Sequence, residues 1–267
     1  MKIGNFDSLL EDHLEDAKII AIPHQRDEEE MEEDHTDAPL PEVLPILPLK
    51  NTVLFPGVIM PISIKREASL ELINDAKKER LIGVVSQRND NDAPSKEDFY
   101  SIGVVARIIK ILKIPDGSIS VLVQGTRRFQ ITEFVEEQPY FKAKIQESPE
   151  LLPEEEDEEF TATMEVVRDI SLKLAKETTS GGLEVPFVLQ NIDNDFFLIN
   201  YVASTSPLSV GEKQDILEQN SLVTRAWAII KYFGVELQKA TLRREIQNKV
   251  HMDFDKQQRD YFLHQQI

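Results

Sequence analysis

The spacing of apolar residues changes near Pro153, and this change limits what the chain can fold into. Residues 43–149 are rich in Val, Ile and Leu, arranged in short runs that Pro, Gly and Asp separate. After Pro153, apolar residues recur at intervals of three or four along several segments. Short alternating runs are typical of strands, whereas the longer interval is typical of amphipathic helices. The sequence therefore predicts the α+β class, with a β lobe at 43–149 followed by helices.

The β lobe is predicted to contain about six strands and one helix, which is enough for a small closed or nearly closed β structure. Prolines at positions 45, 48, 56 and 61 break its first segment into short pieces. Proline suits edge strands, bulges and corners because it cannot donate to a β ladder. The segment 67–80 has the spacing of a short amphipathic helix. Two runs rich in β-branched residues flank a turn at 115–118 and are predicted to be paired strands.

The rest of the chain is predicted to form a helical lobe at 150–220 and a long helix at 221–267. Ser209 and Glu212 have the spacing of a capping box, which predicts that a helix begins between them. A continuous helix over 221–267 would be about 70 Å long, so a lobe of this size could cover only part of its length. We therefore expect a fragment that was cut within a helix leading to another domain. An apolar stripe marks the first helix of the lobe: Phe160, Met164, Val167, Ile170 and Leu174.

The net charge of −18 is distributed unevenly along the chain. Residues 1–42 carry 14 acidic and 3 basic residues, whereas residues 43–149 carry 13 acidic and 15 basic residues. The first segment has few apolar residues and strong self-repulsion, which predicts a disordered leader. It is interpreted either as a solvated leader or as an acidic interaction arm.

Several enzyme classes are excluded by residues that the chain lacks. There is no Cys, which excludes disulfides and Cys nucleophiles and fits a reducing cytoplasm. All five His residues lie outside 43–234, so this part cannot hold a Ser-His-Asp triad or a His metal site. No glycine precedes a lysine, so a phosphate-binding GxxxxGK loop is missing. No secretion signal or membrane span is predicted, and we expect no catalytic residue, cofactor or metal in this chain.

A nucleic-acid-binding surface is one alternative for the β lobe. Basic residues next to aromatic residues can bind phosphates and stack on bases. The net charge of 43–149 is only +2, however, and the aromatic residues also suit a core. The spacing of the first three basic residues favours a helix, but the β-branched content around them favours a strand. The candidates are Arg107, Lys110, Lys113, Arg127, Arg128, Lys142 and Lys144, with Phe129 and Phe141.

A second candidate site surrounds the predicted turn at Pro56 and Gly57. Four apolar residues lie beside this turn, namely Phe55, Val58, Ile59 and Met60. Their side chains are interpreted either as ordinary core or as an exposed patch that binds unfolded polypeptide. The second interpretation makes them the candidate substrate-binding residues.

Three segments resemble the amino-terminal domain of Lon proteases. They are residues 44–64 (LPILPLKNTVLFPGVIMPISI), the strands SIGVVARI and LVQGTRRFQI, and the helical part from INYVASTSPLSVGEKQDILEQ to DKQQRDYFLHQQI. The resemblance covers about residues 43–267 and implies a PUA-like β pseudo-barrel, a helical bundle and a long helix that leads to an AAA+ ATPase ring.

The resemblance also implies a function in cytoplasmic protein quality control. The parent protein would be a hexameric ATP-dependent serine protease that uses ATP, Mg and a Ser-Lys dyad. The sequence motifs of the ATPase and peptidase domains have no counterpart in this chain. This module would bind unfolded or misfolded proteins, and we expect it to self-associate only weakly by itself. The alternative is a PUA-like module that binds nucleic acid or other proteins without protease domains.

Overall fold

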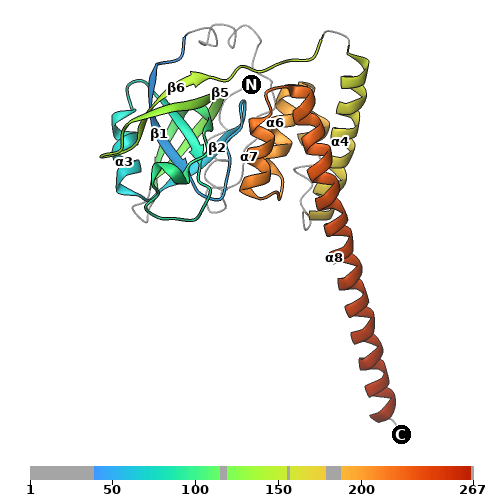
Figure 1. Ribbon diagram of the computed structural model, residues 1–267. Helices are drawn as coiled ribbons and strands as arrows, with labels where there is room; N and C mark the ends of the chain where they lie inside the picture. Colours follow the sequence, from blue (N-terminus) through green and yellow to red (C-terminus); the bar gives the residue numbers. More distant parts are fainter. Residues whose placement is uncertain (1–38, 115–118, 155–156, 179–187, 266–267) are drawn as a thin grey trace, which may run out of the picture.

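The computed structural model describes residues 39–114, 119–154, 157–178 and 188–265 of the chain. Nearly all of the acidic leader predicted at 1–42 lies outside the described residues, as does the turn predicted at 115–118. The described residues form two lobes and a projecting helix (Figure 1). This arrangement confirms the predicted α+β class.

Six strands and one α-helix make up the β lobe, as the residue pattern predicts. Five strands close into a barrel, in which each strand pairs with two neighbours in the order β5-β4-β3-β1-β6 and back to β5. The sixth strand, β2, joins the outside of this ring by pairing with β5 alone among the described strands. The elements are β1 (Val43–Leu49), β2 (Ile59–Ile64), α3 (Glu67–Asp75), β3 (Leu81–Ser86), β4 (Ile102–Lys113), β5 (Ile119–Glu136) and β6 (Lys142–Glu147).

Because β5 is long, it can both close the barrel by pairing with β6 and pair with the additional strand β2. This strand has 18 residues and pairs with β4 along most of its length. On its other side, its first part pairs with β2 and its last part pairs with β6. Register shifts interrupt both the β4 and the β6 ladders, and such bulges increase the bending that a small barrel needs. The basic residues Arg107, Lys110 and Lys113 therefore lie on a strand and not on a helix.

The helical lobe contains α4 (Glu158–Thr178), α6 (Asp195–Thr205), α7 (Val210–Glu218) and α8 (Leu222–Gln265), as far as the structure describes it. The predicted capping box is present at the start of α7. The Ser209 hydroxyl accepts a hydrogen bond from the Glu212 amide, and the Glu212 carboxylate accepts one from the Ser209 amide at 2.9 Å. The side chain of Asn194 caps α6 in a similar way by accepting from the Phe197 amide.

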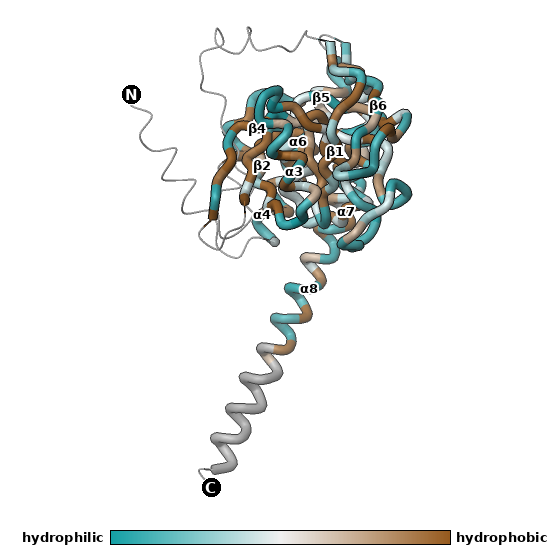
Figure 2. Tube along the Cα trace, turned by 90° about the vertical axis from the view of Figure 1, so that its left-hand side faces the viewer, coloured by the Kyte–Doolittle hydropathy of each residue, from teal (hydrophilic) through white to brown (hydrophobic). Residues whose placement is uncertain are grey.

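The apolar stripe predicted on α4 packs along the first half of α8. The side chains of Phe160, Met164, Val167 and Leu174 are buried, and Ile170 lies against the same core. One hydrophobic cluster contains residues of β1 to β5 and α3 together with residues of α4, α6, α7 and the start of α8, and a second, smaller cluster contains residues of β1 and β3 to β6. The two lobes are therefore joined by a continuous apolar interior, where Figure 2 shows most of the hydrophobic positions.

The helix α8 extends beyond both lobes, as Figure 1 shows. Ala240, with 8% exposure, is the last buried hydrophobic residue among the α8 side chains that the structure describes. Beyond it, Leu242, Ile246, Val250 and Met252 are all more than half exposed, at 57%, 54%, 54% and 71%. The predicted long terminal helix is confirmed.

Candidate functional site

The turn that carries the predicted substrate-binding residues is a type II turn. Pro56 and Gly57 occupy its two central positions, Gly57 has a φ of 78°, and the Val58 amide donates to the Phe55 carbonyl at 3.2 Å. A type II turn favours proline first and needs a positive φ next, which glycine adopts without strain. The side chains of Phe55 and Val58, on both sides of the turn, join the hydrophobic cluster that the two lobes share.

The structure corrects the interpretation of these residues as an exposed patch. The side chains of Phe55, Val58 and Met60 are 0%, 1% and 4% exposed, so they belong to the core. Burial follows from a close approach of β5, where Gly125 lies against the turn. A Cβ atom at Gly125 would come within 2.3 Å of the Phe55 carbonyl oxygen. Ile59 alone among the four candidates is partly exposed.

The strand that follows the turn has one open edge. Its hydrogen-bond pattern is set at Gly125, whose amide donates to the Val58 carbonyl and whose carbonyl accepts from the Gly57 amide, both at 2.9 Å. Backbone groups of successive strand residues point to opposite sides. With the register that pairs Met60 with Val123, the amides and carbonyls of Met60, Ile62 and Ile64 therefore face β5. Those of Ile59, Pro61 and Ser63 face away from it, and we call these three residues the β2 edge.

The residues proposed for nucleic-acid binding do not form an open platform. Arg128 and Phe129 are 1% and 0% exposed. Arg127, Lys142 and Lys144 each form an ion pair with a glutamate of the barrel, at 3.4, 2.7 and 2.8 Å. Phe141 packs edge-on against Phe99, with 4.9 Å between ring centroids. The basic side chains therefore largely neutralise local acids, and the aromatic rings complete the barrel core.

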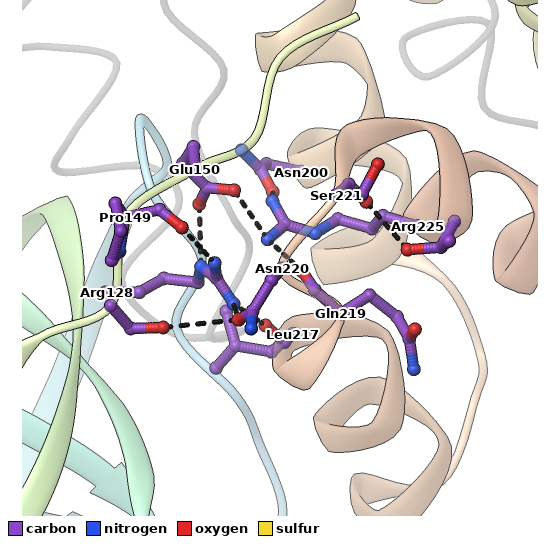
Figure 3. Close-up of polar contacts among 11 residues, drawn as sticks. Arg128, Pro149, Glu150, Asn200, Leu217, Gln219, Asn220, Ser221 and Arg225 are labelled. Atoms are coloured by element: carbon purple, nitrogen blue, oxygen red, sulfur yellow. Dashed lines mark hydrogen bonds and ion pairs between the residues drawn. The ribbon is translucent and has the colours of Figure 1, made fainter.

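The buried Arg128 joins the two lobes, a role that its position next to Arg127 does not reveal. Its Nε donates to the Glu150 carboxylate at 2.8 Å, and its other nitrogens donate to the carbonyls of Leu217 and Pro149 at 2.9 and 3.1 Å. Arg128 lies on β5, Glu150 on the connection between the lobes and Leu217 on α7. Figure 3 shows the guanidinium surrounded by these acceptors.

A second buried arginine reaches the same carboxylate from α8. Arg225 donates to Glu150 at 2.8 Å, to the Asn200 side chain at 3.1 Å and to the Gln219 carbonyl at 2.8 Å (Figure 3). We call Arg128, Glu150 and Arg225 the inter-lobe network. Both arginine side chains are 0% exposed and the glutamate side chain is 19% exposed.

One carboxylate in this network faces two guanidinium groups. Burial lowers the pKa of Arg225 to about 10, while the charge of Glu150 acts in the opposite direction. Carbonyl oxygens accept from both guanidinium groups, while the Nε of Arg225 is buried without a partner. Next to the network, Leu151 exchanges backbone hydrogen bonds with Asn220 and Leu222, at 2.9 Å each. The network therefore fixes the connection between the lobes to the start of α8.

A buried lysine lies in the same lobe. Lys213 is 9% exposed, donates to the Ser204 carbonyl at 2.7 Å, and has a pKa lowered to about 8 by burial. A carbonyl at the end of α6 attracts a cation because the helix dipole is negative there. The neighbouring Gln214 donates to the Ile102 carbonyl at 2.9 Å and forms another contact between the lobes. Gln214 also donates to the Glu218 carboxylate at 3.0 Å, so both residues hold helix ends and lobes together.

Within the described ranges, no cluster of His, Asp or Glu has the arrangement of a metal site. The helices of those ranges also include none that is long and apolar enough to cross a membrane. The candidate features of the described residues are the β2 edge and the inter-lobe network.

Comparison with known proteins gives consistent matches. The family model of the "ATP-dependent protease La (LON) substrate-binding domain" matches residues 43–233. The Lon protease of Flavobacterium johnsoniae is 48% identical over all of this chain, and that of Cytophaga hutchinsonii is 36% identical over 95% of it. The chain spans only 32% and 31% of the lengths of these relatives, so it corresponds to about a third of each.

Two solved structures share the fold. The N-terminal domain of a Mycobacterium avium complex Lon protease aligns with a TM-score of 0.59 and 19% identity, covering 72% of this chain and 98% of that domain. A Lon N-terminal domain protein from Xanthomonas campestris aligns with a TM-score of 0.51 and 20% identity, covering 71% and 98%. At these identities the likeness establishes the fold alone.

Proposed function

Because this chain belongs to the family of ATP-dependent protease La (LON) substrate-binding domains, we propose that it binds unfolded or misfolded polypeptides for a Lon-type protease. The printed description of the family supports this role. The chain itself would be a non-catalytic module.

The rest of the proposed function belongs to a longer protein. Since the relatives are about three times as long as this chain, we propose that the parent carries an ATPase and a peptidase domain beyond α8. ATP and Mg would act there, and the parent would assemble as a hexamer in the cytoplasm. The exposed apolar residues on the outer half of α8, such as Leu242 and Ile246, support a neighbouring domain in the parent because an isolated helix has no cover for them.

The single observation that carries the substrate-binding proposal is the family match over residues 43–233, which spans both lobes. Within the predicted turn segment, Ile59 offers an accessible apolar side chain, whereas Phe55, Val58 and Met60 hold the strand in place from the core. We therefore assign direct contact to Ile59 and a supporting role to the other three residues.

Binding of a permanently unfolded protein tests this proposal. The probe is fluorescently labelled α-lactalbumin that has been reduced and carboxymethylated, and native α-lactalbumin with intact disulfides is the control. The purified chain is expected to bind the unfolded form at about micromolar affinity or weaker, because ordering a flexible chain offsets much of the contact free energy. Equal binding of both forms, or no binding of either, would contradict the proposed function.

A further inference from the structure

We propose that the β2 edge binds the substrate through its backbone, by adding an extended segment of unfolded polypeptide to the sheet as one more strand. This inference rests on the proposed function and names the place and mode of binding. Strand addition reads the main chain, which every polypeptide has, and side-chain pockets add only preference. A folded protein has already paired most of its backbone groups, so this mode distinguishes folding states without a sequence code.

The ladder geometry shows which backbone groups are available. Ile59 and Ser63 each direct an amide and a carbonyl away from β5, whereas Pro61 between them directs only a carbonyl. No strand of the described residues pairs with this side of β2. An added strand could therefore form its full pattern at both ends of the β2 edge and lose one hydrogen bond at its centre.

Side chains along the β2 edge suit an apolar or acidic segment. Ile59 and Pro61 are partly exposed and apolar. The β2 strand itself carries no charge, and exposed Lys113 on β4 and Lys65 after β2 lie at the same end of the sheet. Opposite charge favours an approaching carboxylate at short range.

The same features disfavour a second copy of this chain as the occupant. Two β2 edges that pair about a two-fold axis at Pro61 would place two prolines opposite each other and lose hydrogen bonds on both strands. The occupant to which we commit is therefore an unfolded polypeptide segment.

Three substitutions in the chain test this assignment with the labelled, carboxymethylated α-lactalbumin as probe. Ser63→Pro removes an outward amide without removing a bond to β5, and Pro61 shows that the strand tolerates proline at this alternate position. We expect affinity to fall about three- to ten-fold, the usual effect of one hydrogen bond. Ser63→Ala keeps the backbone amide, so this variant should bind the probe as tightly as the unsubstituted chain does.

Pro61→Val makes the opposite change. It keeps an apolar side chain and adds the missing outward amide, so affinity is expected to rise by a similar factor of about three to ten. Hydrogen exchange gives a direct readout, because the amides of Ile59 and Ser63 should exchange more slowly in the presence of the probe, whereas those of Met60 and Ile62 are already bonded to β5.

The outcomes separate the two proposals. Suppose that the unsubstituted chain binds the probe, but that Pro61→Val binds no better and the Ile59 and Ser63 amides gain no protection. The β2 edge is then not the site, and the proposed function stands. If the unsubstituted chain does not bind the probe, the proposed function itself fails. If Ser63→Pro fails to fold, Pro61→Val and the exchange data decide. Dimerisation of Pro61→Val without increased probe binding would identify a second copy as the occupant and overturn the assignment.

Discussion

Replacing Glu150 by Gln should test whether the inter-lobe network stabilises the whole molecule. The substitution keeps the shape of the side chain but removes the charge that Arg128 and Arg225 share. One carboxylate oxygen also becomes an amide nitrogen, which places a donor against a guanidinium donor at a position where the present distance is 2.8 Å. Two buried cations would then remain with neutral acceptors only.

The expected loss of unfolding free energy follows from the burial of the three side chains of the network. Removing one partner of a fully buried ion pair costs about 3–5 kcal/mol of unfolding free energy. The arginine side chains are 0% exposed, which places them in this class, but the 19% exposure of Glu150 admits some solvent. The carbonyls of Leu217 and Gln219 also remain as acceptors. We therefore expect a loss of about 2–4 kcal/mol.

Urea unfolding gives the measurement, and the chain offers two useful probes. Trp227 is the only tryptophan in the sequence and lies on α8, so its fluorescence reports on the helical lobe. Far-ultraviolet circular dichroism reports on both lobes. The matched control is Glu147→Gln, because Glu147 pairs with Arg127 at 3.4 Å in a partly exposed position. The control should lose less than about 1 kcal/mol.

Two results would refute this reasoning. If both substitutions changed the free energy of unfolding by the same small amount, the buried network would stabilise no more than a surface pair. If Glu150→Gln stabilised the protein, the cost of burying Glu150 would exceed its attraction to both arginines. A separation of the fluorescence and dichroism transitions in the Glu150→Gln protein would instead show that the network makes the lobes unfold together.

Further predictions concern pH, packing and activity. Because the pKa of Lys213 is lowered to about 8 in the folded state, stability should rise as the pH increases above this value, and thermal melts should show that Lys213→Met removes most of this rise. Gly125→Ala should destabilise the barrel by about 2 kcal/mol or more, since its Cβ would lie 2.3 Å from the Phe55 carbonyl oxygen, whereas Gly211→Ala, with 3.8 Å to its nearest neighbour, should not lower the melting temperature. The purified chain should hydrolyse neither ATP nor casein, and turnover that a substitution within this chain abolishes would disprove this.

Local sequence patterns predict much of the fold of this protein. The switch from β-branched runs to helical stripes near Pro153, the Pro56–Gly57 turn and the Ser209–Glu212 capping box each depend on residues a few positions apart. Propensity, turn conformation and capping operate over this range, so the sequence states them directly. The absence of cysteine from the sequence, and of histidine from residues 43–234, likewise limits the chemistry whatever the fold.

Whether an individual side chain is buried, and which residues it contacts, depends on the tertiary structure. The sequence leaves Phe55, Val58 and Met60 open to a core or a surface role, and the approach of Gly125, about seventy residues later, buries them. Arg128 resembles its neighbour Arg127 in sequence, yet strand alternation points it toward the helical lobe. Glu150 and Arg225 lie 75 positions apart, and no local pattern marks them as partners. Patterns between neighbours determine the elements, whereas strand closure and lobe packing, which join distant residues, determine which side chains and which strand edge remain available for binding.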